Sequence, residues 1–121
     1  MFRMTLRAGL AATLLAGLAA CESMITGGPL LRPGEPTGVI EVVNNSGGVL
    51  DVVLISDCNA STYGLNRLPQ GQAIPHGGRY RFTVSAGCWD VDAGAIGVGE
   101  ARQRMDVAAG GLSRYTVGPA R

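Results

Sequence analysis

The sequence predicts an all-β fold, a small Ig-like antiparallel β-sandwich of about six or seven strands with one disulfide. From Thr37 onward, β-branched and aromatic residues gather in short runs separated by glycine, asparagine, serine and proline, which is typical of short strands joined by turns. No part of this region sustains the apolar period of a helix. Two cysteines, Cys58 and Cys88, lie within it.

Residues 1–20 have the three parts of a secretory signal peptide. Arg3 and Arg7 precede an apolar stretch at 8–20 that only Thr13 interrupts. As a helix this stretch would be about 20 Å long, shorter than the ~30 Å hydrocarbon core of a bilayer. We therefore expect a cleaved signal rather than a membrane span.

The signal ends in Leu18-Ala19-Ala20-Cys21, which resembles the lipobox of bacterial lipoproteins at every position. The resemblance implies cleavage between Ala20 and Cys21, a diacylglyceryl group on the Cys21 thiol and acylation of the new amino terminus. Two or more acyl chains hold a protein firmly to a bilayer. In such lipoproteins an aspartate after the cysteine retains the protein at the inner membrane, so Glu22 favours the periplasmic face of the outer membrane. The alternative is an ordinary signal peptide with a cysteine nearby.

Residues 21–36 are expected to form a flexible tether that begins at the lipid-bearing cysteine. The segment 22–36 carries three prolines and three glycines without periodicity, as linkers do. The alternative is an edge strand through Leu30-Leu31. The domain then occupies 37–121, and its small core favours a disulfide staple.

The strands of this domain are expected at 38–44, 48–56, 79–86, 88–95, 100–107 and 112–118. Within the second strand, the segment 49–55 is apolar on both faces except at Asp51, which is typical of a central strand.

The third and fourth strands are expected to form a hairpin with a two-residue turn at Ala86-Gly87. In this register Phe82 lies opposite Val91, and Arg81 opposite Asp92. The apolar side chains then share one face of the sheet, because side chains alternate along a strand, and opposite charges meet on the other face. Asp90 and Asp92 are accordingly expected to form surface pairs with Thr83 and Arg81 rather than a metal or acid–base site.

The chain has three cysteines, and an odd number in an exported protein needs an explanation. With Cys21 lipidated, Cys58 and Cys88 remain as a pair in an oxidising compartment, which predicts a disulfide. The alternatives are two free buried thiols or a metal site. We expect no metal, because two cysteines and the distant His76 do not complete a tetrahedral shell.

No catalytic residue is assigned. His76, the only histidine, lies between Pro75 and Gly77-Gly78 and is expected in a turn. Nucleophilic catalysis needs a nucleophile beside an oriented base, and no neighbouring residue supplies one. The glycine-rich segment 94–100 lacks the third glycine and the following helix of a phosphate-binding loop, so it predicts a hairpin connection.

The chain after the signal is close to electrically neutral, with eight arginines and nine carboxylates. It has no basic run of the kind that binds nucleic acid. Arg79 and Arg81 share one strand face, as do Arg102 and Arg104. On neighbouring strands, the four would form an anion site for lipid headgroups or cell-wall polymer. A solvated face paired with carboxylates is the favoured interpretation.

The segment 56–72 is long for a connection between strands, and long ordered loops are often functional. Tyr63, Asn66 and Arg67 would offer a ring, an amide and a guanidinium to a ligand. The alternative is a structural loop that plugs the sheet edge with Leu65 and Leu68.

Three segments, VVNNSGGVLDVVLIS, STYGLNRL and RFTVSAGCWDVDA, together resemble small secreted bacterial β-sandwich domains over roughly residues 40–93. In these domains an N-x-S/T-G motif, a strand, an aromatic-Gly-x-Asn-x-Leu loop and a G-x-W/Y-D-V strand follow one another. Tyr63 stands where tryptophan is expected. The resemblance implies the fold and no particular activity.

Together these observations favour a membrane-anchored periplasmic lipoprotein with a non-enzymatic binding or structural role and no cofactor. Its expected partners are the membrane, through the lipid on Cys21, and a periplasmic protein or other envelope component contacted by the 56–72 loop. The first alternative is a periplasmic inhibitor of a cell-wall hydrolase such as lysozyme, a task of small β-rich disulfide-bonded lipoproteins. The second is a hydrolase with His76 or a carboxylate as its base.

Overall fold

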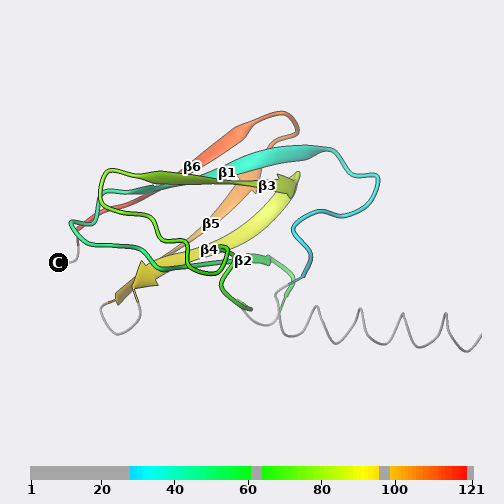
Figure 1. Ribbon diagram of the computed structural model, residues 1–121. Coiled ribbons are helices and arrows are strands. Elements are labelled where there is room, and N and C mark those ends of the chain that lie inside the picture. Colours follow the sequence, from blue (N-terminus) through cyan, green and yellow to red (C-terminus); the bar gives the residue numbers. More distant parts are fainter. Residues whose placement is uncertain (1–27, 61–63, 96–98, 120–121) are drawn as a thin grey trace, which may run out of the picture.

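The computed structural model describes residues 28–60, 64–95 and 99–119 (Figure 1). Its strands are β1 (Thr37–Asn44), β2 (Val52–Asp57), β3 (Arg79–Ser85), β4 (Gly87–Ala95), β5 (Gly99–Val107) and β6 (Leu112–Val117). Each lies where the sequence predicts a strand. β2 begins later than expected because Leu50, inside the expected strand, instead forms an isolated bridge with Ile74.

The strands form two three-stranded sheets, in the orders β3-β1-β6 and β2-β4-β5, which pack face to face (Figure 1). β1 is antiparallel to β3 and parallel to β6. β4 is antiparallel to both β2 and β5. The predicted all-β sandwich is confirmed, and its one departure from an antiparallel arrangement is the parallel β1–β6 pair.

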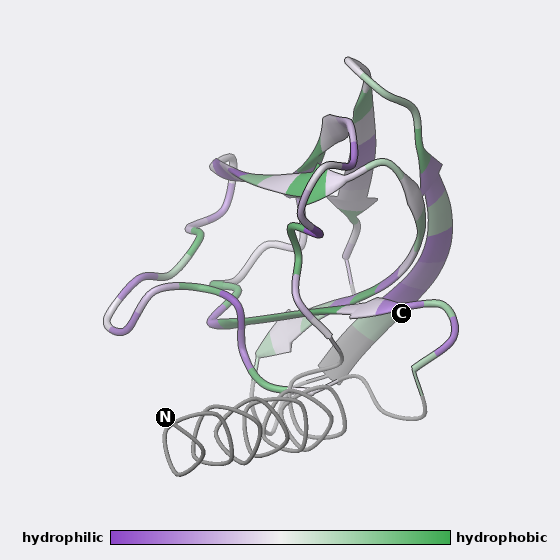
Figure 2. Ribbon diagram, turned by 90° about the vertical axis from the view of Figure 1, so that its right-hand side faces the viewer, coloured by the Kyte–Doolittle hydropathy of each residue, from purple (hydrophilic) through white to green (hydrophobic). Residues whose placement is uncertain are grey.

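The core lies between the sheets and is built from alternate residues of every strand. Figure 2 shows the resulting alternation of hydrophobic and hydrophilic bands along the strands. Trp89 is completely buried, and its indole Nε1 donates a hydrogen bond to the Ser85 carbonyl at 2.8 Å. The other core residues are Ile40, Val42, Leu50, Val53, Ile55, Leu68, Ile74, Phe82, Val84, Val91, Ala93, Met105, Val107, Tyr115 and Val117.

The expected hairpin between the third and fourth strands is wrong, because β3 pairs with β1 whereas β4 belongs to the other sheet. The chain crosses between sheets at Ser85–Gly87, and Gly87 takes a φ of 139° there, which glycine adopts without strain. Phe82 and Val91 are both buried and belong to opposing faces rather than to one sheet. Their alternation fits either arrangement, so it does not distinguish them.

The expectation that the second strand is central is also wrong, since β4 is the middle strand of its sheet and β2 lies at the edge. The outer edge of β2 is covered by the following loop. Isolated bridges join Leu54 to Asn66 and Leu50 to Ile74. The loop thus takes the place of a further strand at this edge, while the side chains opposite the core, Val52 and Leu54, are half-buried.

Residues 28–36, expected to belong to the flexible tether, lie against the domain, and we call them the N-terminal strap. The Leu30 and Pro36 carbonyls accept hydrogen bonds from Ser85 N at 2.7 Å and Ala86 N at 2.8 Å, and the Leu30 side chain packs against the core. The strap therefore occupies the backbone groups at the crossing between the sheets. Residues 21–27 lie outside the described part of the chain.

Candidate functional site

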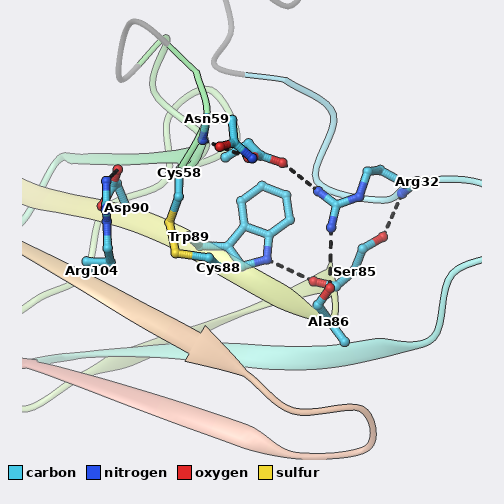
Figure 3. The surroundings of a disulfide bond; sticks show 10 residues. Arg32, Cys58, Asn59, Ser85, Ala86, Cys88, Trp89, Asp90 and Arg104 are labelled. Atoms are coloured by element: carbon cyan, nitrogen blue, oxygen red, sulfur yellow. Dashed lines mark hydrogen bonds and ion pairs between the residues drawn. A yellow bond between two sulfur atoms is a disulfide. The ribbon is translucent and has the colours of Figure 1, made fainter.

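Cys58 and Cys88 form a disulfide with a Cα–Cα distance of 5.6 Å (Figure 3), as the sequence predicts. It joins the residue after β2 to the second residue of β4, which are neighbours in one sheet. The bond lies beside the buried Trp89. The predicted lipid-bearing residue, Cys21, and the cleavage position Ala20 lie outside the described residues, so their roles stay predictions.

Arg32 of the strap has a structural role that the sequence analysis missed. Its guanidinium contacts Asp57 Oδ2 at 2.8 Å and Glu35 Oε2 at 2.6 Å, and it lies 5.1 Å from the centre of the Trp89 ring (Figure 3). The backbone N–H of Arg32 also donates to Ser85 Oγ at 2.7 Å. A cation over an aromatic face is attracted by the ring quadrupole. Arg32 thus fastens the strap over the crossing, through contacts that no local sequence pattern signals.

The loop residue Asn66 satisfies the edge of β2 as a paired strand would. Its side-chain Oδ1 accepts a hydrogen bond from Val53 N at 2.9 Å, and its Nδ2 donates to the Asp51 carbonyl at 3.0 Å. Unpaired strand edges invite association with other chains. The side-chain amide covers part of this edge.

Arg67 continues the same cover along β2. Its backbone N–H donates to the Val53 carbonyl at 2.7 Å, and its guanidinium donates to the Ile55 carbonyl through Nε at 3.1 Å and Nη2 at 2.9 Å. Nη2 also donates to the Gly28 carbonyl of the strap. One side chain therefore joins the loop, the edge strand and the start of the strap.

The structure brings the candidate binding residues Asn66 and Arg67 together, but it commits both to the fold. Leu68 is buried, as the structural alternative predicts, whereas Leu65 is 57% exposed. Tyr63 lies outside the described residues. These placements favour the structural alternative for this part of the loop, and a partner contact by the loop stays a prediction.

His76 occupies a turn, as expected, and its Nδ1 accepts a hydrogen bond from Gly47 N at 3.0 Å. The nearby Asn44 is buried, and its Nδ2 donates to the Gly48 and Ile74 carbonyls at 2.7 Å each. His76 and Asn44 thus join the turn after β1 to the segment before β3.

Asp90 and Asp92 form ion pairs on the outer face of their sheet, as expected in kind but with different partners. Asp90 pairs with Arg104 at 2.9 Å, and Asp92 pairs with Arg102 at 3.1 Å. The expected pairing with Arg81 and Thr83 is wrong because β5, not β3, lies beside β4. The segment 94–100 connects these two antiparallel strands, as expected of a hairpin, although residues 96–98 lie outside the described part.

The four arginines considered as an anion site are divided between the sheets. Arg102 and Arg104 lie on β5, whereas Arg79 and Arg81 lie on β3 in the other sheet. On that sheet Arg114 of β6 joins them, and all three contact Glu41 of β1. We call these residues the Glu41 cluster.

Glu41 is the centre of this cluster. Its Oε2 accepts from Arg81 Nε at 2.7 Å, and its Oε1 accepts from Arg114 Nε at 2.8 Å and lies 3.6 Å from Arg79 Nη1. Ile40 and Val42 on either side of it face the core, so Glu41 lies on the outer face. It is nevertheless 0% exposed, because the arginine side chains cover it. Its isolated charge in the apolar run GVIEVVN is the signal that the sequence analysis overlooked.

The pKa of Glu41 is held below its ordinary value, chiefly by the hydrogen bonds from Arg114 and then from Arg81, while desolvation acts in the opposite direction. A carboxylate that accepts hydrogen bonds from charged donors is favoured in its ionised form. Glu41 therefore stays charged in the folded protein.

Across the described ranges, no group of three or more His, Cys, Asp or Glu side chains is arranged to hold a metal ion. Within the same ranges, no helix has the length and apolar character needed to cross a bilayer. No protein-family model matches this chain, and no curated protein matches it either.

We expect the double substitution Cys58→Ser/Cys88→Ser to lower the free energy of unfolding by about 3–4 kcal/mol, because the unfolded chain regains the entropy of a closed loop. Urea unfolding followed by tryptophan fluorescence measures this loss. The reduced wild-type protein is the control and should unfold at the same midpoint as the variant. A variant as stable as the oxidised wild type would contradict the prediction.

We expect Asn66→Ala to lower the free energy of unfolding by about 1–3 kcal/mol, because the Val53 N–H and the Asp51 carbonyl lose their partner. The matched control is Leu65→Ala, which truncates an exposed neighbour in the same loop and should change stability by less than about 0.5 kcal/mol. Equal stabilities of the two variants would argue against the edge-covering role.

We expect Glu41→Gln to destabilise the protein at neutral pH, because the three surrounding guanidinium groups then lack a carboxylate. The folded-state pKa of Glu41 is lowered, so its contribution is fully present above its ordinary value of 4.5 and is lost as the pH falls toward the folded-state pKa. The difference in urea midpoint between wild type and variant should therefore shrink in acid.

The matched control for Glu41→Gln is Glu35→Gln, which removes a more exposed carboxylate from an ion pair with Arg32. Exposed pairs of this kind contribute little to stability, so its midpoint should stay close to that of the wild type at every pH. A difference in urea midpoint between wild type and Glu41→Gln that does not change with pH would refute a role for the ionised carboxylate.

Proposed function

We propose that this chain is an exported lipoprotein, held by lipid on Cys21 at the periplasmic face of the outer membrane, with a non-enzymatic binding or structural role. The observation that supports this best is the disulfide. It uses two of the three cysteines, and the remaining one is the cysteine of the lipobox-like sequence. Lipidation accounts for an exported protein with an odd cysteine.

The engagement of the titratable side chains supports a binding or structural role over catalysis. His76 Nδ1 accepts a hydrogen bond from a backbone N–H, while Glu41, Asp90 and Asp92 are paired with arginines. A general base must come within hydrogen-bond reach of the proton that it takes from its substrate. These four groups instead stabilise turns and strand pairs.

The strap supports an anchor close to the domain. Only six residues, 22–27, separate Cys21 from Gly28, where the described strap begins. A fully extended chain of this length spans at most about 25 Å. A domain attached in this way stays near the bilayer surface, where a partner in the envelope or the membrane itself is within reach.

Labelling of cells with an alkyne analogue of palmitate tests the proposal. We expect label on the wild-type protein and recovery of the protein in the outer-membrane fraction, because lipid on Cys21 provides the anchor. Cys21→Ala should abolish both. The control Cys58→Ser/Cys88→Ser keeps only Cys21 and should still be labelled. Unlabelled wild-type protein in the soluble fraction would overturn the anchor.

A further inference from the structure

The outer face of the β3-β1-β6 sheet concentrates positive charge in one row of paired residues. Arg81 and Arg114 are the direct partners of Glu41 on the two neighbouring strands. Arg79 lies on the same face of β3, two positions from Arg81. Its guanidinium reaches Glu41 at 3.6 Å without a short hydrogen bond. Three guanidinium groups therefore surround a single carboxylate.

This face differs in charge from the rest of the domain. The Glu41 cluster carries a net charge of +2, from three arginines and one glutamate, whereas carboxylates outnumber arginines in the chain after the signal. On the outer face of the other sheet, Arg102 and Arg104 are each opposite an aspartate. The positive excess is thus specific to one face.

The arginines of this face retain donors for an external anion. Each guanidinium has five N–H groups, and Arg81 and Arg114 use Nε for Glu41. Among the described residues, no protein acceptor takes the terminal nitrogens of these two side chains. More than half of each arginine side chain is exposed. Free guanidinium ends of this kind match the geometry of phosphate oxygens.

Glu41 orients these donors before any ligand arrives. One of its oxygens accepts from Arg81 Nε and the other from Arg114 Nε. Glu41 itself lies on β1, the central strand of the β3-β1-β6 sheet. Donors fixed in advance lose less side-chain entropy on binding. The carboxylate therefore lowers the net positive charge of the face, but it holds the guanidinium groups of Arg81 and Arg114 in fixed positions.

We infer that this face binds the phosphate groups of anionic lipid headgroups in the bilayer that carries the protein. The inference rests on the proposed lipid anchor for the choice of ligand. Only six residues separate Cys21 from Gly28, so a tether of at most about 25 Å keeps the whole domain, this face included, close to that bilayer. Tethering also raises the local headgroup concentration, so weak contacts suffice.

The test uses the chain 21–121 with Cys21→Ser, so that it does not depend on acylation, and measures cosedimentation with phosphatidylglycerol-containing vesicles. We expect binding that weakens at high salt and is absent with phosphatidylcholine alone. Arg79→Gln should reduce the partition coefficient about fivefold, and Arg81→Gln/Arg114→Gln about 25-fold, since each basic residue near a membrane contributes a similar factor.

The matched control is Arg104→Gln, which removes the same charge from the other sheet and should bind within about twofold of the wild type. Arg79→Gln leaves both short hydrogen bonds to Glu41 in place, and thermal unfolding verifies that each variant is folded. No binding by the wild type, equal binding to neutral vesicles, or an equal loss in Arg104→Gln would overturn the inference.

A titration with inorganic phosphate separates the lipid surface from a free anion. Saturable binding of phosphate without any binding to anionic vesicles would show an anion site and would refute the lipid assignment. The palmitate-labelling experiment fails or succeeds independently of these measurements, so the anchor and the phosphate-binding face are tested separately.

Discussion

The two sheets depend on the burial of their apolar faces against each other, because a three-stranded sheet has no other cover for such a face. Trp89 lies at the point where this packing meets the crossing between the sheets, and its indole bonds to the Ser85 carbonyl. The disulfide and the strap both lie beside it (Figure 3). The disulfide, the strap and the hydrogen bond of the buried indole are thus concentrated where the chain passes between the sheets.

The strand positions and the disulfide are predictable because their signals are local or countable. β-Branched runs bounded by glycine and proline mark the strands. Of the three cysteines, the one in the lipobox-like sequence is assigned to the lipid, so the other two remain as a pair. The strand pairing is not predictable in this way. Phe82 and Val91 show the same alternation whether their strands are neighbours or face each other across a core, so the pattern fits the expected hairpin and the observed crossing equally well.

In the candidate site, likewise, the sequence reveals the residue types but not the contacts between residues that are far apart in the chain. The sequence marks Asn66 and Arg67 as polar residues in a long loop, but only the fold shows that they cover the edge of β2. The arginines of β3 are visible in the sequence, whereas their grouping with Arg114 needs the parallel β1–β6 pair. Polar side chains of this domain often replace a missing strand or complete an ion pair, so residue type alone does not identify a ligand site.

The strap leads directly into β1, and β1 lies between β3 and β6. A mechanical pull on the amino-terminal side of the domain therefore loads the contacts of Arg32 first and then a strand held by neighbours on both sides. Its hydrogen bonds would have to shear together rather than open one by one.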